Sequence, residues 1–312
     1  MDYIKLLFWF IVFPGFIFTA VVGLLASWID RKVTARVQWR VGPPWYQGFA
    51  DIVKLLAKET IVPKGSSAVV FLLAPLVSLA SVTLVSTILG ISNLNPARGF
   101  IGDIIVVLYL LTIPAICVIV GGFASANPIA AFGASREMKL VLSYELPFIL
   151  ALVVPVIHAN GAIQLGEILT YQANNGVIVG SLSGSLALVV AILCMQAKLT
   201  LVPFDIPEAE TEIIAGPYIE YSGSPLAVFK LSRAMMLFTL PLFLVVVFMG
   251  GIKSAPPLSI LMGILKYVAL LVGIVLIRNT NPRVRIDQAM RFFWGPVTVI
   301  AVAAVVLALL GL

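Results

Sequence analysis

The chain has 312 residues, of which 61% are hydrophobic and only 11% are charged. Soluble domains carry about 45–50% apolar and about 25% charged residues, so this composition excludes a water-soluble globular protein. The net charge of +6 could suggest a nucleic-acid partner. The position of the basic residues between apolar segments explains the charge better, and no nucleic acid is expected.

Apolar segments long enough to cross a bilayer as helices recur along the chain. They lack the strict alternation of transmembrane strands, so we expect an all-α, polytopic membrane bundle that forms a single integral membrane domain over residues 1–312. The first segment is too long for the apolar part of a signal peptide and is interpreted as a retained anchor. The eight predicted spans are residues 6–28, 68–90, 102–123, 139–158, 177–197, 231–250, 259–277 and 292–311.

The basic residues predict the orientation of the bundle. Most of the 20 lysines and arginines fall in the loops after spans one, three, five and seven. The positive-inside rule places these loops in the cytoplasm and both termini outside the cell membrane. Function is therefore expected at the inward loops.

The chain offers no pattern for catalysis or metal binding of its own. It has one histidine and no phosphate-binding glycine loop. Cys117 and Cys194 lie within spans and far apart, so we interpret them as core residues rather than metal ligands or a disulfide. The residues favour moving charge over making bonds.

The first inward loop, residues 29–67, predicts an amphipathic helix. An apolar stripe from Trp45 to Leu56 recurs at helical spacing after the Gly42-Pro43-Pro44 turn. Such a helix could simply cap the bundle, or it could form one wall of a cavity shared with a partner protein. The length of the loop favours a functional role.

Span four carries a carboxylate into the membrane. Arg136 and Glu137 precede the predicted span, and Glu145 lies roughly 13 Å beyond Arg136 at about 1.5 Å per residue. An ionised carboxylate at that depth costs about 3 kcal/mol, so it must be paired, hydrated or protonated. Glu145 is either a structural group bonded to a neighbouring helix or a proton carrier, and we favour the second.

The third inward loop contains an acidic run. Its members are Asp205, Glu208, Glu210 and Glu212, and Glu220 follows. Pro207 suits the first turn of a helix, which Asp205 and Glu208 could cap. Glu208 and Glu212 would then share one helical face, where like charges repel and raise each other's pKa. The run is interpreted as part of a proton relay, with capping as the alternative.

Together these motifs resemble the H subunit of bacterial complex I, a family that includes mitochondrial NADH dehydrogenase subunit 1. The resemblance covers essentially the whole chain. Six motifs carry it in the expected order: Asp30-Arg31-Lys32, Arg40 to Pro43, Asp51 to Glu59, Gly133 to Arg136, Ser143 to Glu145, and Pro203-Phe204-Asp205 with its glutamates and Glu220 to Gly223.

The resemblance implies a connecting subunit between antiporter-like membrane subunits and a cytoplasmic redox arm that holds iron–sulfur clusters. By motif match, the proton path would be lined by Glu145, Asp205, Glu208, Glu210, Glu212 and Glu220. The interface or cavity beneath the redox arm would be bordered by Asp30, Arg31, Arg36, Arg40, Asp51, Lys54, Glu59, Arg136 and Glu137.

Two positions depart from the quinone-reducing members of the family. Where those carry an acid and an arginine before the Pro-Phe-Asp motif, this chain has Lys198 and Leu201. The departures argue against a quinone site, and the motif looks more like that of energy-converting, membrane-bound hydrogenases and a related sulfur-reducing complex. The expected function is to couple electron transfer in a hydrogenase-type arm, with a nickel–iron centre, to proton or sodium translocation. The alternatives are the quinone-site subunit of complex I, a subunit of a sulfur-reducing complex, a stand-alone ion carrier and a purely structural anchor.

Overall fold

The computed structural model describes residues 2–252 and 256–312, and within them it contains helices and no strand. In chain order the helices are α1 (Asp2–Ile11), α2 (Phe16–Val37), α3 (Gln47–Leu56), α4 (Ala68–Leu94), α5 (Asp103–Leu110), α6 (Ile113–Ala124), α7 (Pro128–His158), α8 (Leu165–Asn175), α9 (Leu182–Lys198), α10 (Glu210–Ile213), α11 (Gly223–Met249), α12 (Pro257–Thr280), α13 (Ile286–Phe292) and α14 (Thr298–Leu309). A π-helical turn, Phe293–Val297, joins α13 to α14.

The predicted spans are present, and the all-α polytopic fold is confirmed. In the described part of the chain, seven helical segments are long and apolar enough to cross a membrane: Ile4–Val37, Ala68–Leu94, Asp103–Ala124, Pro128–His158, Gly223–Met249, Pro257–Thr280 and Ile286–Leu309. The remaining predicted span is α9, whose 17 residues lie at the short end of the range for a spanning helix.

Three helices extend well beyond the spans that hydropathy predicts. Helix α2 continues through Asp30 to Val37, α7 begins at Pro128, and α11 begins at Gly223. The start of α7 is fixed by Asn127, whose side chain accepts a hydrogen bond from the Ile129 amide at 2.8 Å, and by a proline at the first helical position. Hydropathy ends a span at the first charges, whereas a helix ends where its backbone hydrogen bonds end.

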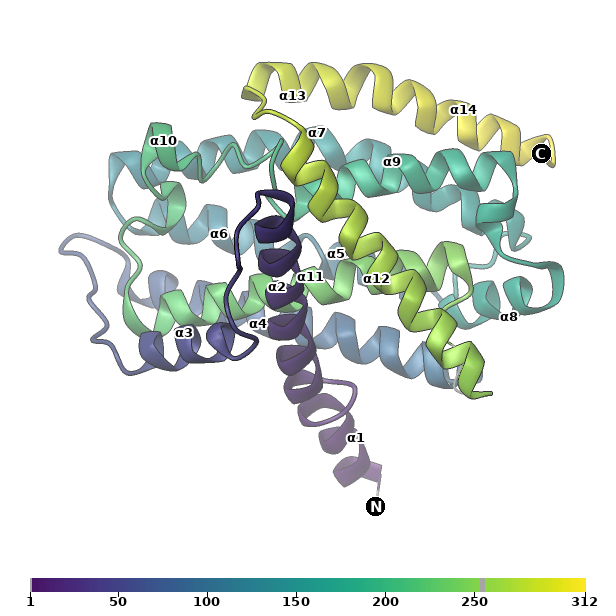
Figure 1. Cartoon of the computed structure of the whole chain (residues 1–312), viewed down its shortest axis with the longest axis horizontal. Helices are drawn as coiled ribbons and strands as arrows, with labels where there is room; N and C mark the ends of the chain where they lie inside the picture. Colours follow the sequence, from purple (N-terminus) through teal and green to yellow (C-terminus); the bar gives the residue numbers. More distant parts are fainter. Residues whose placement is uncertain (1, 253–255) are drawn as a thin grey trace.

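Helix α11 lies at the centre of the bundle. In its most apolar window 89% of the residues are buried, against 22–50% in the other six segments. Helices α7, α9 and α14 pack on one another, while α2 and α12 cross α11 obliquely (Figure 1). At the α2–α11 crossing a side chain at Gly23 would place its Cβ 2.6 Å from the Ala234 carbonyl oxygen, so glycine permits the close approach. Cys117 and Cys194 are buried and unbonded to each other.

The amphipathic helix predicted in the first inward loop is confirmed as α3. It packs against α2 and α11 and buries none of its residues completely. Arg31 on α2 donates a hydrogen bond to Asp51 on α3 at 3.1 Å. This ion pair, together with the apolar stripe, fixes α3 beside the long first span.

Candidate functional site

The acidic run does not form the single helical face that its spacing predicts. Helix α10 begins only at Glu210, and Pro207 lies in a turn before it, closed by the Ala209 amide donating to the Asp205 carbonyl at 3.0 Å. Glu208 therefore precedes the helix, and its carboxylate diverges from that of Glu212. The Glu210 side chain lies outside the described part of the structure.

Each described carboxylate of the run has its own arginine. Asp205 pairs with Arg283 on the segment before α13 at 2.9 Å. Glu212 pairs with Arg136 on α7 at 2.7 Å. Glu208 forms a short ion pair with Arg233 on α11. The like charges are thus separated by cations from three different elements.

The electrostatic environments of Asp205 and Glu212 are opposite. Burial raises the pKa of Asp205, and the Arg283 guanidinium only partly offsets it. The hydrogen bond from Arg136 and its positive charge lower the pKa of the exposed Glu212 carboxyl. The expectation that Glu208 and Glu212 share a helical face and raise each other's pKa is therefore wrong for Glu212, because its nearest charge is the Arg136 cation.

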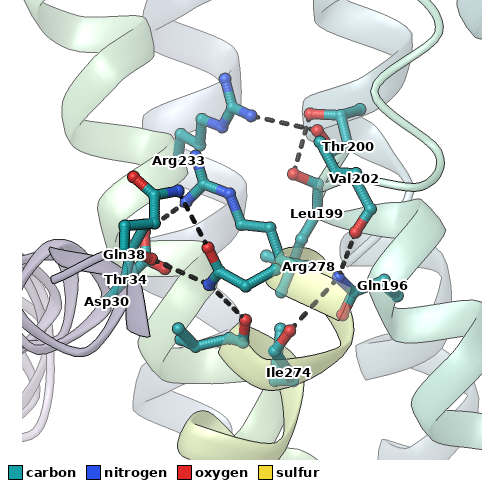
Figure 2. Close-up of polar contacts among 12 residues, drawn as sticks. Asp30, Thr34, Gln38, Gln196, Leu199, Thr200, Val202, Arg233, Ile274 and Arg278 are labelled. Atoms are coloured by element: carbon teal, nitrogen blue, oxygen red, sulfur yellow. Dashed lines mark hydrogen bonds and ion pairs between the residues drawn. The ribbon is translucent and has the colours of Figure 1, made fainter. Parts of the chain in front are cut away.

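The Glu208–Arg233 pair lies where three cavities meet. We name them the inner cavity, of about 50 Å³, the front cavity, of about 340 Å³, and the rim cavity, of about 300 Å³. Both side chains of the pair line all three cavities. Arg233 also donates to the Thr200 carbonyl at 3.2 Å, which holds the guanidinium across the junction (Figure 2).

The inner cavity brings Glu137 and Lys198 next to this pair. Glu137 was predicted to border the interface or cavity beneath a redox arm, and it is 2% exposed. It lies in the interior because α7 begins nine residues earlier, at Pro128, and turns this position inward. The Glu137 Oε2 atom has no hydrogen-bond partner among the described residues, so the carboxyl group can take up or release a proton without breaking a bond there.

Lys198, at the C-terminal end of α9, links the inner cavity to Glu145. Its Nζ lies 3.1 Å from Glu145 Oε2, and its side chain is only 1% exposed. The ammonium group also lies 5.3 Å from the centre of the Tyr144 ring and 5.0 Å from that of Phe148. Glu145 is therefore paired, which is one of the three states expected for a carboxylate at this depth. Its partner Lys198 was noted in the sequence only as a departure from the family pattern.

The front cavity lies between α2, α3, α11 and α12. Its charged residues include the Arg31–Asp51 pair and the pair of Asp30 with Arg278, joined at 2.7 Å (Figure 2). Lys230 lines both the front and the rim cavity. Helix α3 contributes Gly48, Asp51 and Ile52, so it forms a wall of the cavity.

Desolvation alone would raise the pKa of Asp51. The hydrogen bonds from Arg31 and Gln47 outweigh it and leave the pKa below its usual value. Asp51 is therefore ionised at neutral pH, and the contact between α2 and α3 is a charged one.

Other predicted site residues lie away from this centre. The side chains of four of them are exposed: Arg36, Arg40, Lys54 and Glu59. Glu220 accepts a short hydrogen bond from Asn127, the N-cap of α7, so it braces the start of that helix. No group of three or more histidine, cysteine, aspartate or glutamate side chains in the described part of the chain could hold a metal ion.

The partners of the acids come from distant segments and were not predicted from the sequence. The sequence predicts Arg278 and Arg283 only as inward-loop charges. Arg233 lies at the inward end of the predicted span 231–250, and a charge inside an apolar span is itself a signal of a buried partner. The pairing itself has no local signal, because 25 residues separate Arg233 from Glu208 and 248 separate Arg278 from Asp30.

Comparison with known proteins agrees with this architecture. The family model described as NADH dehydrogenase matches residues 10–309. The H subunit of the NADH-quinone oxidoreductase of Thermomicrobium roseum is 35% identical, over 94% of this chain and 93% of that protein. The corresponding H subunit of Anoxybacillus flavithermus is 34% identical, over 87% of this chain and 83% of that protein.

Among solved structures, a chain of the membrane-bound sulfane sulfur reductase, an archaeal respiratory membrane complex, superposes with a TM-score of 0.84. It is 30% identical, and the match covers 94% of this chain and 96% of that chain. The chain therefore belongs to the NADH dehydrogenase family, as its six motifs predicted.

Proposed function

We propose that this chain is the membrane subunit of a complex I-like respiratory complex and that it carries protons between a redox arm and the membrane interior. The observation that carries the proposal is the junction at Glu208 and Arg233. From it the front cavity leads to the charged end of the bundle, and the inner cavity leads to Glu137 and Lys198. An enclosed set of titratable groups that reaches membrane depth is suited to proton transfer.

The geometry supports a relay through Glu137, Lys198 and Glu145. Glu137 and Glu145 lie on the same helix, eight residues apart, which corresponds to roughly 12 Å along its axis. That gap is too long for direct proton transfer between carboxyl groups. Lys198 on α9 lies between the two carboxyl groups. Its amine contacts the Glu145 carboxylate, and its side chain lines the inner cavity. The lysine can therefore exchange a proton with Glu145 and, through water in the cavity, with Glu137.

The arrangement of charge supports a partner at the end of the bundle that bears the front and rim cavities. We assign this end to the cytoplasm, with both termini outside, following the positive-inside rule. A redox arm with iron–sulfur clusters would cover the exposed bases there, and antiporter-like membrane subunits would flank the bundle. Hydrogenase-type chemistry, with a nickel–iron centre in the arm, remains our preferred assignment, since Lys198 and Leu201 replace the residues typical of quinone-reducing relatives.

The test is Glu137→Gln in the assembled complex, reconstituted in vesicles. The amide cannot carry a proton, so redox turnover should continue or slow while proton uptake per electron falls at least tenfold. Glu167→Gln provides the matched control, because Glu167 is exposed at the first turn of α8. Equal proton uptake in the Glu137→Gln variant and wild type would remove the inner cavity from the path.

A quinone-reducing subunit is the second candidate function. The front cavity, at about 340 Å³, has the size of a small-molecule site, and the curated relatives are named for quinone reduction. Quinone analogues would then inhibit the complex, and Leu201→Trp, which narrows this cavity, would weaken the inhibition. Turnover that is insensitive to quinone analogues would exclude this candidate.

A further inference from the structure

Helices α2 and α12 form a V over the surface of α11. They meet at their C-terminal ends and diverge toward the other side of the bundle (Figure 1). Polar contacts close the narrow end: Arg278 pairs with Asp30 at 2.7 Å, and Asn279 donates to the Thr34 hydroxyl at 3.2 Å and accepts from Gln38 at 3.3 Å (Figure 2). These contacts fix the narrow end, and farther along α12 Lys266 donates to the Met249 carbonyl of α11 at 2.7 Å.

The wide end contains a cavity of about 610 Å³, which we name the apolar cavity. Phe238 and Leu242 of α11 form its floor, and Phe18, Val22, Ile264 and Tyr267 belong to its walls on α2 and α12. The rings of Phe18 and Tyr267 pack edge-on against Phe238, at 5.9 and 5.5 Å between centroids. An apolar space of this size among membrane-spanning helices is filled by hydrocarbon, because water would find few partners in it.

Two polar side chains of the apolar cavity, Ser86 and Asn93, are engaged, whereas the hydroxyl of a third, Tyr267, has no hydrogen-bond partner among the described residues. Ser86 donates to the Thr83 carbonyl at 2.9 Å. Asn93 donates to the Ile252 carbonyl at 2.9 Å and accepts from the Ile252 amide at 2.8 Å. Apart from the Tyr267 hydroxyl, the described lining is apolar or already hydrogen-bonded, so the cavity suits a hydrocarbon chain.

Two cations belong to segments that adjoin lining residues of the apolar cavity, although neither side chain lines it. Arg98 follows the end of α4, whose Asn93 and Leu94 line the cavity, and its guanidinium lies 5.0 Å above the ring of Trp9 on α1. Lys5 lies one turn from Trp9, on the same face of α1. The next residues of the chain after α1, Phe13 and Pro14, also line the cavity. Both cations lie outside the lining, so they are available only to a group that projects from the cavity, as the phosphate of a lipid would.

We propose that the apolar cavity binds one acyl chain of an anionic phospholipid, whose phosphate is held by Arg98 and Lys5. The lipid fills the V between α2 and α12 and sets the angle between them. Because Asp30 and Arg278 stand at the apex of the V and line the front cavity, the bound lipid also sets the geometry of that charged cavity.

The test counts phospholipids that remain on the purified complex after extensive detergent washing, by native mass spectrometry. The probes are phosphatidylglycerol and phosphatidylcholine with identical acyl chains, added to delipidated complex. Wild type should retain one phosphatidylglycerol that Ile264→Trp, which fills the cavity, loses. Arg98→Gln should lower the retention of phosphatidylglycerol relative to phosphatidylcholine by about fivefold.

The matched control is Val299→Trp on the lipid-facing side of α14, where Val299 is exposed. It should leave the retained phosphatidylglycerol in place. Retention that is the same in Ile264→Trp and wild type would overturn the proposal, and so would an isoprenoid quinone as the molecule that Ile264→Trp displaces. Because lipid retention is counted without turnover, the result is independent of proton transport.

Discussion

Lys198→Met removes a positive charge from the interior while keeping a side chain of similar length. The ammonium it deletes lies 3.1 Å from Glu145 Oε2, and the two side chains are 1% and 21% exposed. Breaking a buried ion pair typically costs about 3–5 kcal/mol, because the remaining charge stays desolvated. Glu145 is in part exposed, so we expect the lower bound, about 3 kcal/mol, or roughly a hundredfold in the unfolding equilibrium.

The loss should be recovered by removing the second charge. The double variant Lys198→Met with Glu145→Gln carries neither charge of this ion pair. Replacement of both partners of such a pair often changes the stability little. Unfolding in a detergent series, followed by helical circular dichroism, measures the free energies of the wild type, the two single variants and the double variant. A Lys198→Met chain as stable as wild type, or a double variant no more stable than Lys198→Met, would refute the ion pair as a stabilising contact.

Two further predictions follow from contacts between helices. Gly23→Ala forces α2 away from α11 because the new Cβ lies 2.6 Å from the Ala234 carbonyl oxygen, whereas Gly273→Ala meets open space; thermal unfolding should therefore show a loss in the first variant and little change in the second. The pKa of Asp51 is below its usual value of about 3.9, so its pairing with Arg31 contributes above that pH and is lost as the pH falls through the lowered pKa. The protection factors of the α3 amides, corrected for the intrinsic pH dependence of exchange, should stay high at pH 5 and fall below about pH 4, with Asp51→Asn low at both; protection factors in wild type that do not change with pH would contradict the anchoring role.

The membrane fold could be predicted from the sequence because hydropathy and helix length report directly on the bilayer. The amphipathic helix α3 was also predictable, since its apolar stripe repeats with helical spacing. The ends of α2, α7 and α11 were not, because each helix continues through charged residues that a span prediction treats as loop. The span prediction therefore left Glu137 in a loop, although it lies within α7.

The acidic residues of the candidate site could be predicted from the sequence, but their ion-pair partners could not. Carboxylates in an apolar chain are conspicuous, so Glu145, Asp205 and Glu208 were found. Their counter-charges Lys198, Arg283 and Arg233 come from other segments, and no local pattern indicates a contact across the bundle. The acidic run was also predicted as one helix, because Pro207 is typical of a helix start and the preceding turn has no distinctive sequence.

The ion pair of Glu208 and Arg233 has a consequence for electrical insulation. It stands between the inner cavity and the two larger cavities, so a closed pair interrupts any continuous column of water. A membrane that stores an ion gradient discharges through an uninterrupted column, whatever protein encloses it. Under the proposed function, a rotation of the Arg233 side chain would join the inner cavity to the two larger ones. The same contact is then where turnover in a partner would open the path.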